Sequence, residues 1–111
     1  MLLLKILNRI HIPNYLLHFS NAVSFKLSEA YIYALNISYS YFKKVQNKFY
    51  TQFSFISYNP YMYPKYYSNS KKYSYCRKCF WFKYIILYRI YENSVEVLNI
   101  FHYRSNYKKV V

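Results

Sequence analysis

Two apolar, β-rich runs separated by a short polar segment occupy the last third of the chain. Residues 82–91 are crowded with β-branched and aromatic side chains and contain no glycine or proline, which is typical of a strand. The segment 92–94 can turn the chain, because Asn93 tolerates left-handed backbone geometry and Ser94 can bond nearby amides. Residues 95–101 then return as a partner strand, so the pattern predicts an antiparallel β-hairpin.

The expected hairpin sets the position of the polar side chains that follow it. A small domain without an internal cavity presents its chemistry where a rigid element ends. One sheet edge would therefore carry four candidate side chains, namely His102, Tyr103, Arg104 and Tyr107.

The N-terminal half has the spacing of helices. A short apolar strand is expected at residues 2–8, and Pro13 suits a first helical turn. Apolar side chains then recur every three or four residues in two sets interrupted at Ser28 and Glu29, which predicts two amphipathic helices. The first set is Ile12, Leu16, Phe19, Val23 and Leu27, and the second is Ala34, Ile37, Tyr41, Val45, Phe49, Phe53 and Ile56.

The remaining segments complete an α+β architecture. Residues 57–72 are too irregular for either period and are expected to form a loop, and residues 73–80 precede the hairpin as a further strand. The order is a strand, a two-helix hairpin and three antiparallel strands in one sheet, with the helix pair over one face and the other face open to partners. Because a second core would have too little apolar surface, we expect a single domain over residues 1–111.

The charge balance favours polyanionic partners. Lys and Arg number 16 against three Asp and Glu, which gives a net charge of +13 at pH 7. Nucleic acid, the ribosome or an acidic protein segment would each suit such a chain. An AT-rich coding bias is an alternative origin for the many lysines, tyrosines and asparagines.

The chain contains no glycine, although tight turns and helix ends usually place glycine where φ is positive. We expect Asn59, Asn69 and Asn93 to take these left-handed positions instead.

The apolar runs are far shorter than the roughly twenty residues that a membrane-spanning helix needs. The apolar start of the chain is interrupted at Lys5 and followed by no small-residue cleavage site, which is unlike a signal peptide. We therefore expect no membrane association and a cytoplasmic location.

Cys76 and Cys79 have the spacing of redox and zinc sites. One pair of thiols supplies too few ligands for structural zinc, and in a strand residues three apart point to opposite faces. We expect no metal site and no cofactor, and interpret both cysteines as reduced, small apolar residues.

Several short motifs, taken in order, resemble the RelE/ParE toxins of bacterial type II toxin–antitoxin modules. The resemblance is carried by Tyr75-x-Arg77-Lys78, by the run from Tyr84 to Ile90, and by a last segment from Val95 to Arg104 that ends in His102-x-Arg104. Upstream, Asn59-Pro60-Tyr61-Met62 resembles the connection that follows the second helix in those toxins.

The resemblance implies an acidic antitoxin partner and roles in growth inhibition and plasmid stabilisation. It also implies candidate residues for the site. The catalytic candidates are His102, Arg104 and Tyr107, and the candidates for binding a nucleic acid or a target are Arg77, Lys78, Arg89 and Arg104. In RelE-like nucleases such basic side chains hold the scissile phosphate, and a Tyr, His or Glu assists proton transfer.

One position separates the two branches of the family. RelE-like ribosome-dependent RNases place an arginine one residue after the tyrosine of the third strand, where this chain has Ile85. The sequence therefore favours the ParE-like branch, whose members inhibit DNA gyrase, over an mRNA endoribonuclease. His102 has the alternative interpretation of a strand-end histidine that bonds a neighbouring backbone group.

Two hypotheses outside the family also remain. A basic, tyrosine-rich protein without toxicity could bind single-stranded nucleic acid by stacking bases on its aromatic rings. A chain that forms no stable fold is the other alternative, and it would unfold without cooperativity.

Overall fold

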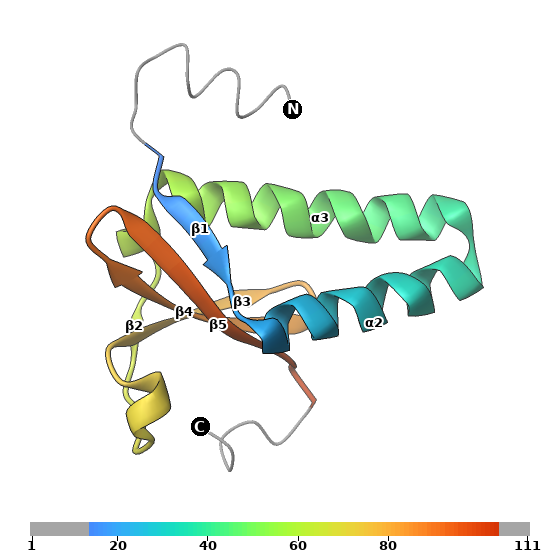
Figure 1. Cartoon of the computed structure of the whole chain (residues 1–111). Helices are drawn as coiled ribbons and strands as arrows, with labels where there is room; N and C mark the ends of the chain where they lie inside the picture. The colour runs from blue at the N-terminus through green and yellow to red at the C-terminus, as the bar shows by residue number, and fades with distance from the viewer. Residues whose placement is uncertain (1–13, 105–111) are drawn as a thin grey trace.

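The computed structural model describes residues 14–104, which form two α-helices, two short 3-10 helices (labelled η) and one mixed sheet. Figure 1 shows the helix pair lying along one side of the sheet and extending past it. The elements in chain order are β1 (Leu16–Phe19), α2 (Asn21–Ile37), α3 (Tyr39–Tyr58), η1 (Pro60–Met62), β2 (Lys65–Tyr66), η2 (Lys71–Tyr73), β3 (Cys76–Trp81), β4 (Tyr84–Tyr91) and β5 (Ser94–His102).

The sheet has five strands in the order β1-β5-β4-β3-β2. The strands β2 to β5 pair antiparallel, and β1 pairs parallel to β5, with Leu16 opposite Ser94 and Phe19 opposite Val97. The order of strand, helix pair and antiparallel strands is compatible with the predicted one, although the observed first strand is not the one expected at residues 2–8. From the resemblance we expected a four-stranded, mixed or mainly antiparallel sheet. The sheet is mixed and has five strands, because β2 adds to one edge and a long crossover returns β1 parallel to β5.

The C-terminal hairpin forms as the sequence predicts, with β4 and β5 joined at a tight turn. The pairing shifts register at Leu87 and Tyr88, which lie opposite Asn99 and Val97, so Leu98 is the extra residue of a β-bulge. Because of this bulge, Leu98 packs beside Leu87 on the face away from the helices.

The first helix begins and ends at different residues from those expected. Residues 16–19 form a strand, because their amides and carbonyls find partners on β5, and a short apolar run fits either period. The helix α2 then passes through Ser28 without a break, and the Ser28 hydroxyl finds an acceptor within the helix, the Ser24 carbonyl at 3.0 Å. The expected opening strand at residues 2–8 lies outside the described residues.

Serines stand at both helix starts. The Ser20 Oγ accepts from the Val23 amide at 3.1 Å and donates to the Leu98 carbonyl at 2.8 Å, which ties the start of α2 to β5. Ser38 ends α2 and begins α3, and its Oγ accepts from the Tyr41 amide at 3.0 Å. The turn between the helices therefore lies ten residues beyond the interruption at Ser28 that the sequence indicated.

The main core lies between the helices and the sheet. It includes Val23, Phe49, Ile86, Tyr88 and Val97, all nearly inaccessible to solvent. A second, smaller cluster lies on the opposite face. Its members are Tyr73, Cys76, Ile85, Leu87, Leu98 and Phe101.

The face opposite the helices is partly covered, contrary to the open face that we expected. Tyr73, which we expected to begin a strand, instead ends η2, and the strand β3 begins at Cys76. The Tyr73 side chain is 2% exposed and accepts a hydrogen bond from the Asn99 Nδ2 at 2.9 Å. Residues 57–72 accordingly contain the short elements η1 and β2 and the start of η2.

Within residues 14–104, positive φ angles occur at Tyr75, Phe82 and Glu92, with values of 60°, 56° and 53°. The expectation that Asn59, Asn69 and Asn93 take these positions is wrong; Asn59, for example, has a φ of −145°. Phe82 and Glu92 each follow directly on the last residue of a strand, so hairpin register determines which residue is forced into left-handed geometry.

No helix within residues 14–104 combines the length and the apolar character needed to cross a membrane.

Candidate functional site

Arg77 and Lys78 are adjacent on β3 and therefore point to opposite faces of the sheet. The Arg77 Nη1 donates to the Tyr63 carbonyl at 2.6 Å and to the Tyr61 carbonyl at 3.4 Å, and its guanidinium lies 5.2 Å from the Tyr61 ring centroid. Arg77 thus holds the segment after η1 against the sheet.

Lys78 belongs to the other face. Its ammonium nitrogen lies 5.1 Å from the ring centroid of Tyr66 and 4.8 Å from that of Phe80. Aromatic faces attract a cation at such distances, so Lys78 is part of a basic and aromatic surface.

Arg89 projects from β4 on the same face as Lys78. Its Nη2 makes an ion pair with the Glu96 Oε1 at 3.0 Å, and its Nη1 donates to the Ser74 carbonyl at 3.4 Å. The two side chains are 30% and 46% exposed. The contacts of Arg89 connect β4 to β5 and to the loop before β3.

His102 and Arg104 lie at the opposite end of β5 from Glu96. The His102 Nδ1 accepts from the Arg104 backbone amide at 3.2 Å, and the imidazole lies 5.0 Å from the Tyr103 ring centroid in a stacked arrangement. The Arg104 Nε donates to the Tyr103 Oη at 2.9 Å. This is the strand-end geometry that we weighed for His102. Tyr107 lies outside the described residues.

The predicted β-structure also implies that its strands lay their guanidinium groups along one rim of the sheet, and the structure contradicts this expectation. Arg77 is opposite Tyr88 in the ladder and so faces the helices, whereas Arg89 is one residue later and faces away. Arg104 follows His102, which is opposite Tyr84 at the far end of β4. Arg77 and Arg89 lie on opposite faces because side chains alternate along strands, and Arg104 is distant because it follows the far end of β5.

The two cysteines also lie on opposite faces, as the strand assignment predicts. Cys76 belongs to the smaller cluster and Cys79 to the main core, where its Sγ lies 2.7 Å from the Gln52 Nε2. Burial raises the pKa of both thiols, to about 11 for Cys76. Thiols in this arrangement are poor nucleophiles and cannot bind one metal ion together.

One cluster of polar residues was not predicted from the sequence. A cavity of about 530 Å³ lies between the helix hairpin and the end of the sheet. It brings together Lys26, Tyr33 and Tyr41 from the helices with Lys83, Tyr84 and His102 from the sheet. Because we expected a break between helices at Ser28, we assigned Lys26 and Tyr33 to different helices. They lie on the same face of one helix, α2.

No protein-family model matches the sequence, and no curated protein shows significant similarity to it.

Proposed function

We propose that the chain is a cytoplasmic toxin of a type II toxin–antitoxin module, of the RelE/ParE kind, that inhibits growth by binding DNA gyrase. The order of its elements carries the proposal. A first strand lies beside the last, two helices cover one face, and four antiparallel strands follow, of which the first has only two residues. This arrangement agrees with the one that the sequence motifs imply for such toxins.

Gyrase rather than RNA is the preferred target because the three candidate arginines that the structure describes do not come together around one phosphate. Arg77 and Arg89 are on opposite faces and hold backbone carbonyls, and Arg104 lies at the far end of β5. Ile85 stands where an RNase would place an arginine, and it is 1% exposed in the smaller cluster. An apolar side chain there cannot stabilise the charge that develops on a phosphate.

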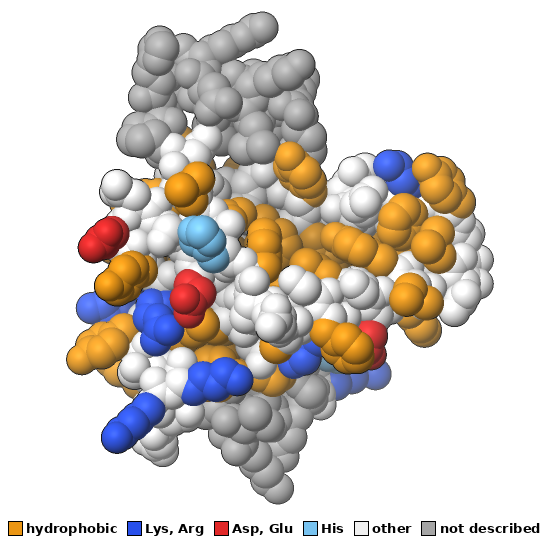
Figure 2. Space-filling model, viewed as in Figure 1, with side chains coloured by type: hydrophobic (Ala, Val, Ile, Leu, Met, Phe, Trp, Pro, Cys, Tyr) orange, Lys and Arg blue, Asp and Glu red, His pale blue; other side chains and the backbone are white. Residues whose placement is uncertain are grey.

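An exposed apolar surface on α2 supports action through protein contacts. Phe25, Ile32 and Leu35 share one side of the helix and are 66%, 60% and 47% exposed. Figure 2 shows hydrophobic side chains gathered along this helix pair, with few charged groups among them. Such patches usually mark interaction sites, and the net charge of +13 would favour an acidic antitoxin.

The first test is expression of the full chain from a titratable promoter, with and without the product of the neighbouring gene. We expect growth arrest that the neighbour relieves, and purified protein should inhibit supercoiling by gyrase. Normal growth on expression of the intact, folded chain alone would refute the proposal. Ribosome-dependent mRNA cleavage that is lost on Arg104→Ala would favour the RNase alternative instead.

A second candidate function, binding of single-stranded nucleic acid, is favoured by a basic and aromatic cavity of about 510 Å³ beside Arg77. Tyr67 and Tyr75, which are 87% and 90% exposed, line it together with Lys65 and Tyr66. Bases can stack on such rings while lysines contact the backbone. This function predicts binding to generic single strands that weakens steeply with salt, and no effect on growth.

A further inference from the structure

The cavity between the helix hairpin and the end of the sheet has the dimensions of a small-molecule site. Its volume is about 530 Å³, within the usual range of ligand pockets. Three parts of the chain form it, namely α2, α3 and the sheet end at the β3–β4 turn and β5. None of these segments can form the cavity without the others.

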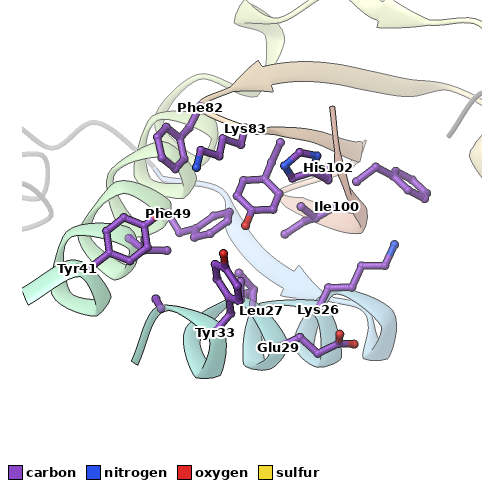
Figure 3. Close-up of a pocket in the computed structure, with 15 residues that line it drawn as sticks. Lys26, Leu27, Glu29, Tyr33, Tyr41, Phe49, Phe82, Lys83, Ile100 and His102 are labelled. Atoms are coloured by element: carbon purple, nitrogen blue, oxygen red, sulfur yellow. The ribbon is translucent and has the colours of Figure 1, made fainter. Parts of the chain in front are cut away.

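Aromatic rings make up much of its wall. Phe49 is 1% exposed at the base, and Phe82 lies on the sheet side. Figure 3 shows Tyr33 rising from α2 toward the sheet, with Tyr41 and Phe49 from α3 beside it. A planar ring placed among these side chains would bury its faces against them.

Three phenol hydroxyls belong to the same space. They come from Tyr33 on α2, Tyr41 on α3 and Tyr84 on β4. Burial raises the pKa of Tyr84, and the proximity of Tyr41 and Tyr33 raises it further. The Tyr84 hydroxyl is therefore protonated near neutral pH, and phenols of this kind both donate and accept hydrogen bonds.

The rim of the cavity is basic. The Lys26 Nζ lies 2.7 Å from the Asn99 Oδ1 and 4.0 Å from the Phe101 ring centroid. Lys83 is exposed in the β3–β4 turn, and His102 stands at the end of β5. One carboxylate, Glu29, is also among the described lining residues, so the two lysines leave the rim with an excess of positive charge.

We propose that this cavity binds a nucleoside monophosphate, with the base between the aromatic rings and the phosphate at the rim beside Lys83 and His102. A purely apolar ligand would desolvate the hydroxyls and lysines without replacing their hydrogen bonds. An inorganic anion would leave the aromatic wall uncovered. A planar base with donors and acceptors on its edge, joined through a sugar to a phosphate, matches both halves of the cavity.

The single tryptophan is a built-in reporter of occupancy. The Trp81 ring centroid lies 5.4 Å from that of Phe49 and 5.9 Å from that of Phe82, which both line the cavity. The full-length protein would be titrated with AMP and GMP, following Trp81 fluorescence and, independently, the heat of binding. We expect saturable binding with one site per chain. Adenosine alone and inorganic phosphate alone should each bind at least about tenfold more weakly.

Substitutions at exposed positions locate the site without disturbing the core. Lys83→Met should weaken AMP binding by roughly tenfold, as expected for loss of a charged hydrogen bond, and Tyr33→Phe should weaken it by a few fold. The matched controls are Lys43→Met on α3 and Tyr91→Phe on β4, which are exposed, lie outside the cavity and should leave affinity unchanged. Equal thermal unfolding of all four variants would show that they fold alike.

Three results would overturn the proposal. These are the absence of saturable binding by either nucleotide, an equal loss of affinity in Lys43→Met and Lys83→Met, and phosphate binding as tightly as AMP. The second would indicate adsorption to the general positive charge, and the third would remove any role for the aromatic wall. All three are independent of growth inhibition, so the toxin proposal is tested separately.

Discussion

The hydrogen bond from Tyr88 to Pro60 is the contact whose loss we expect to destabilise the fold most cleanly. Tyr88 is fully buried on β4, and its hydroxyl donates to the Pro60 carbonyl at 2.7 Å. Burial raises the pKa of the Tyr88 hydroxyl well above its ordinary value, so it remains a donor through the neutral range. This bond ties the first residue of η1 to the centre of the sheet.

Tyr88→Phe keeps the ring and opens no large cavity, but it leaves the buried Pro60 carbonyl without this donor. An unsatisfied buried carbonyl costs about 1–3 kcal/mol, so the free energy of unfolding should fall by that amount. The matched control is Tyr91→Phe on the same strand, where the side chain is 67% exposed and the change should stay within about 0.5 kcal/mol.

Urea denaturation followed by circular dichroism measures both variants against the unaltered chain, with equal m-values required for the comparison. If Tyr88→Phe and Tyr91→Phe differ by less than about 0.5 kcal/mol, the Pro60 carbonyl has another partner and the reasoning fails. A transition without cooperativity in the unaltered chain would contradict the fold itself.

Two further outcomes follow from backbone geometry and burial. Glu92→Gly should raise the free energy of unfolding by roughly 0.5–1 kcal/mol, because glycine adopts the φ of 53° without steric cost. Glu92→Ala should not raise it, because alanine has the same steric cost at this φ as glutamate. Equal effects of the two substitutions in urea denaturation would show that loss of the side chain, and not the backbone geometry, is responsible. Cys76 has a folded pKa of about 11 against an ordinary 9.0, so the unfolded chain loses its proton first and stability should fall as pH rises from about 9 toward 11. The midpoint of thermal unfolding should therefore fall less over that pH range in Cys76→Ala than in the unaltered chain. If the midpoint falls equally with pH in both proteins, the raised pKa of Cys76 is contradicted.

The C-terminal half of the fold could be predicted because its signals are local. Residues 82–101 were expected as a hairpin, and β4 and β5 occupy Tyr84–Tyr91 and Ser94–His102. Side chains alternate along any strand, so the opposite placement of Cys76 and Cys79 followed directly from their spacing. Helical spacing likewise indicated two helices before the sheet.

The N-terminal half depended on partners far away in sequence. Residues 16–19 fit a helical stripe as well as a strand, and their hydrogen bonds to β5, nearly eighty residues later, make them a strand. Ser28 could end a helix or bond within it, and in the structure it lies inside α2 with its hydroxyl donating to the Ser24 carbonyl. At residues 16–19 and at Ser28 the local sequence is compatible with more than one secondary structure. Long-range pairing and packing therefore determined which structure forms.

The candidate site shows the same division. The sequence identified basic and aromatic residue types and the strands that carry them, because composition and strand pattern are visible in the chain. It could not place Arg77, Arg89 and Arg104 relative to one another, since their positions depend on strand register, on the bulge at Leu98 and on strand length. The cavity that joins Lys26, Tyr33 and Lys83 arises only when the helix hairpin packs over the end of the sheet, because three separate segments supply its walls.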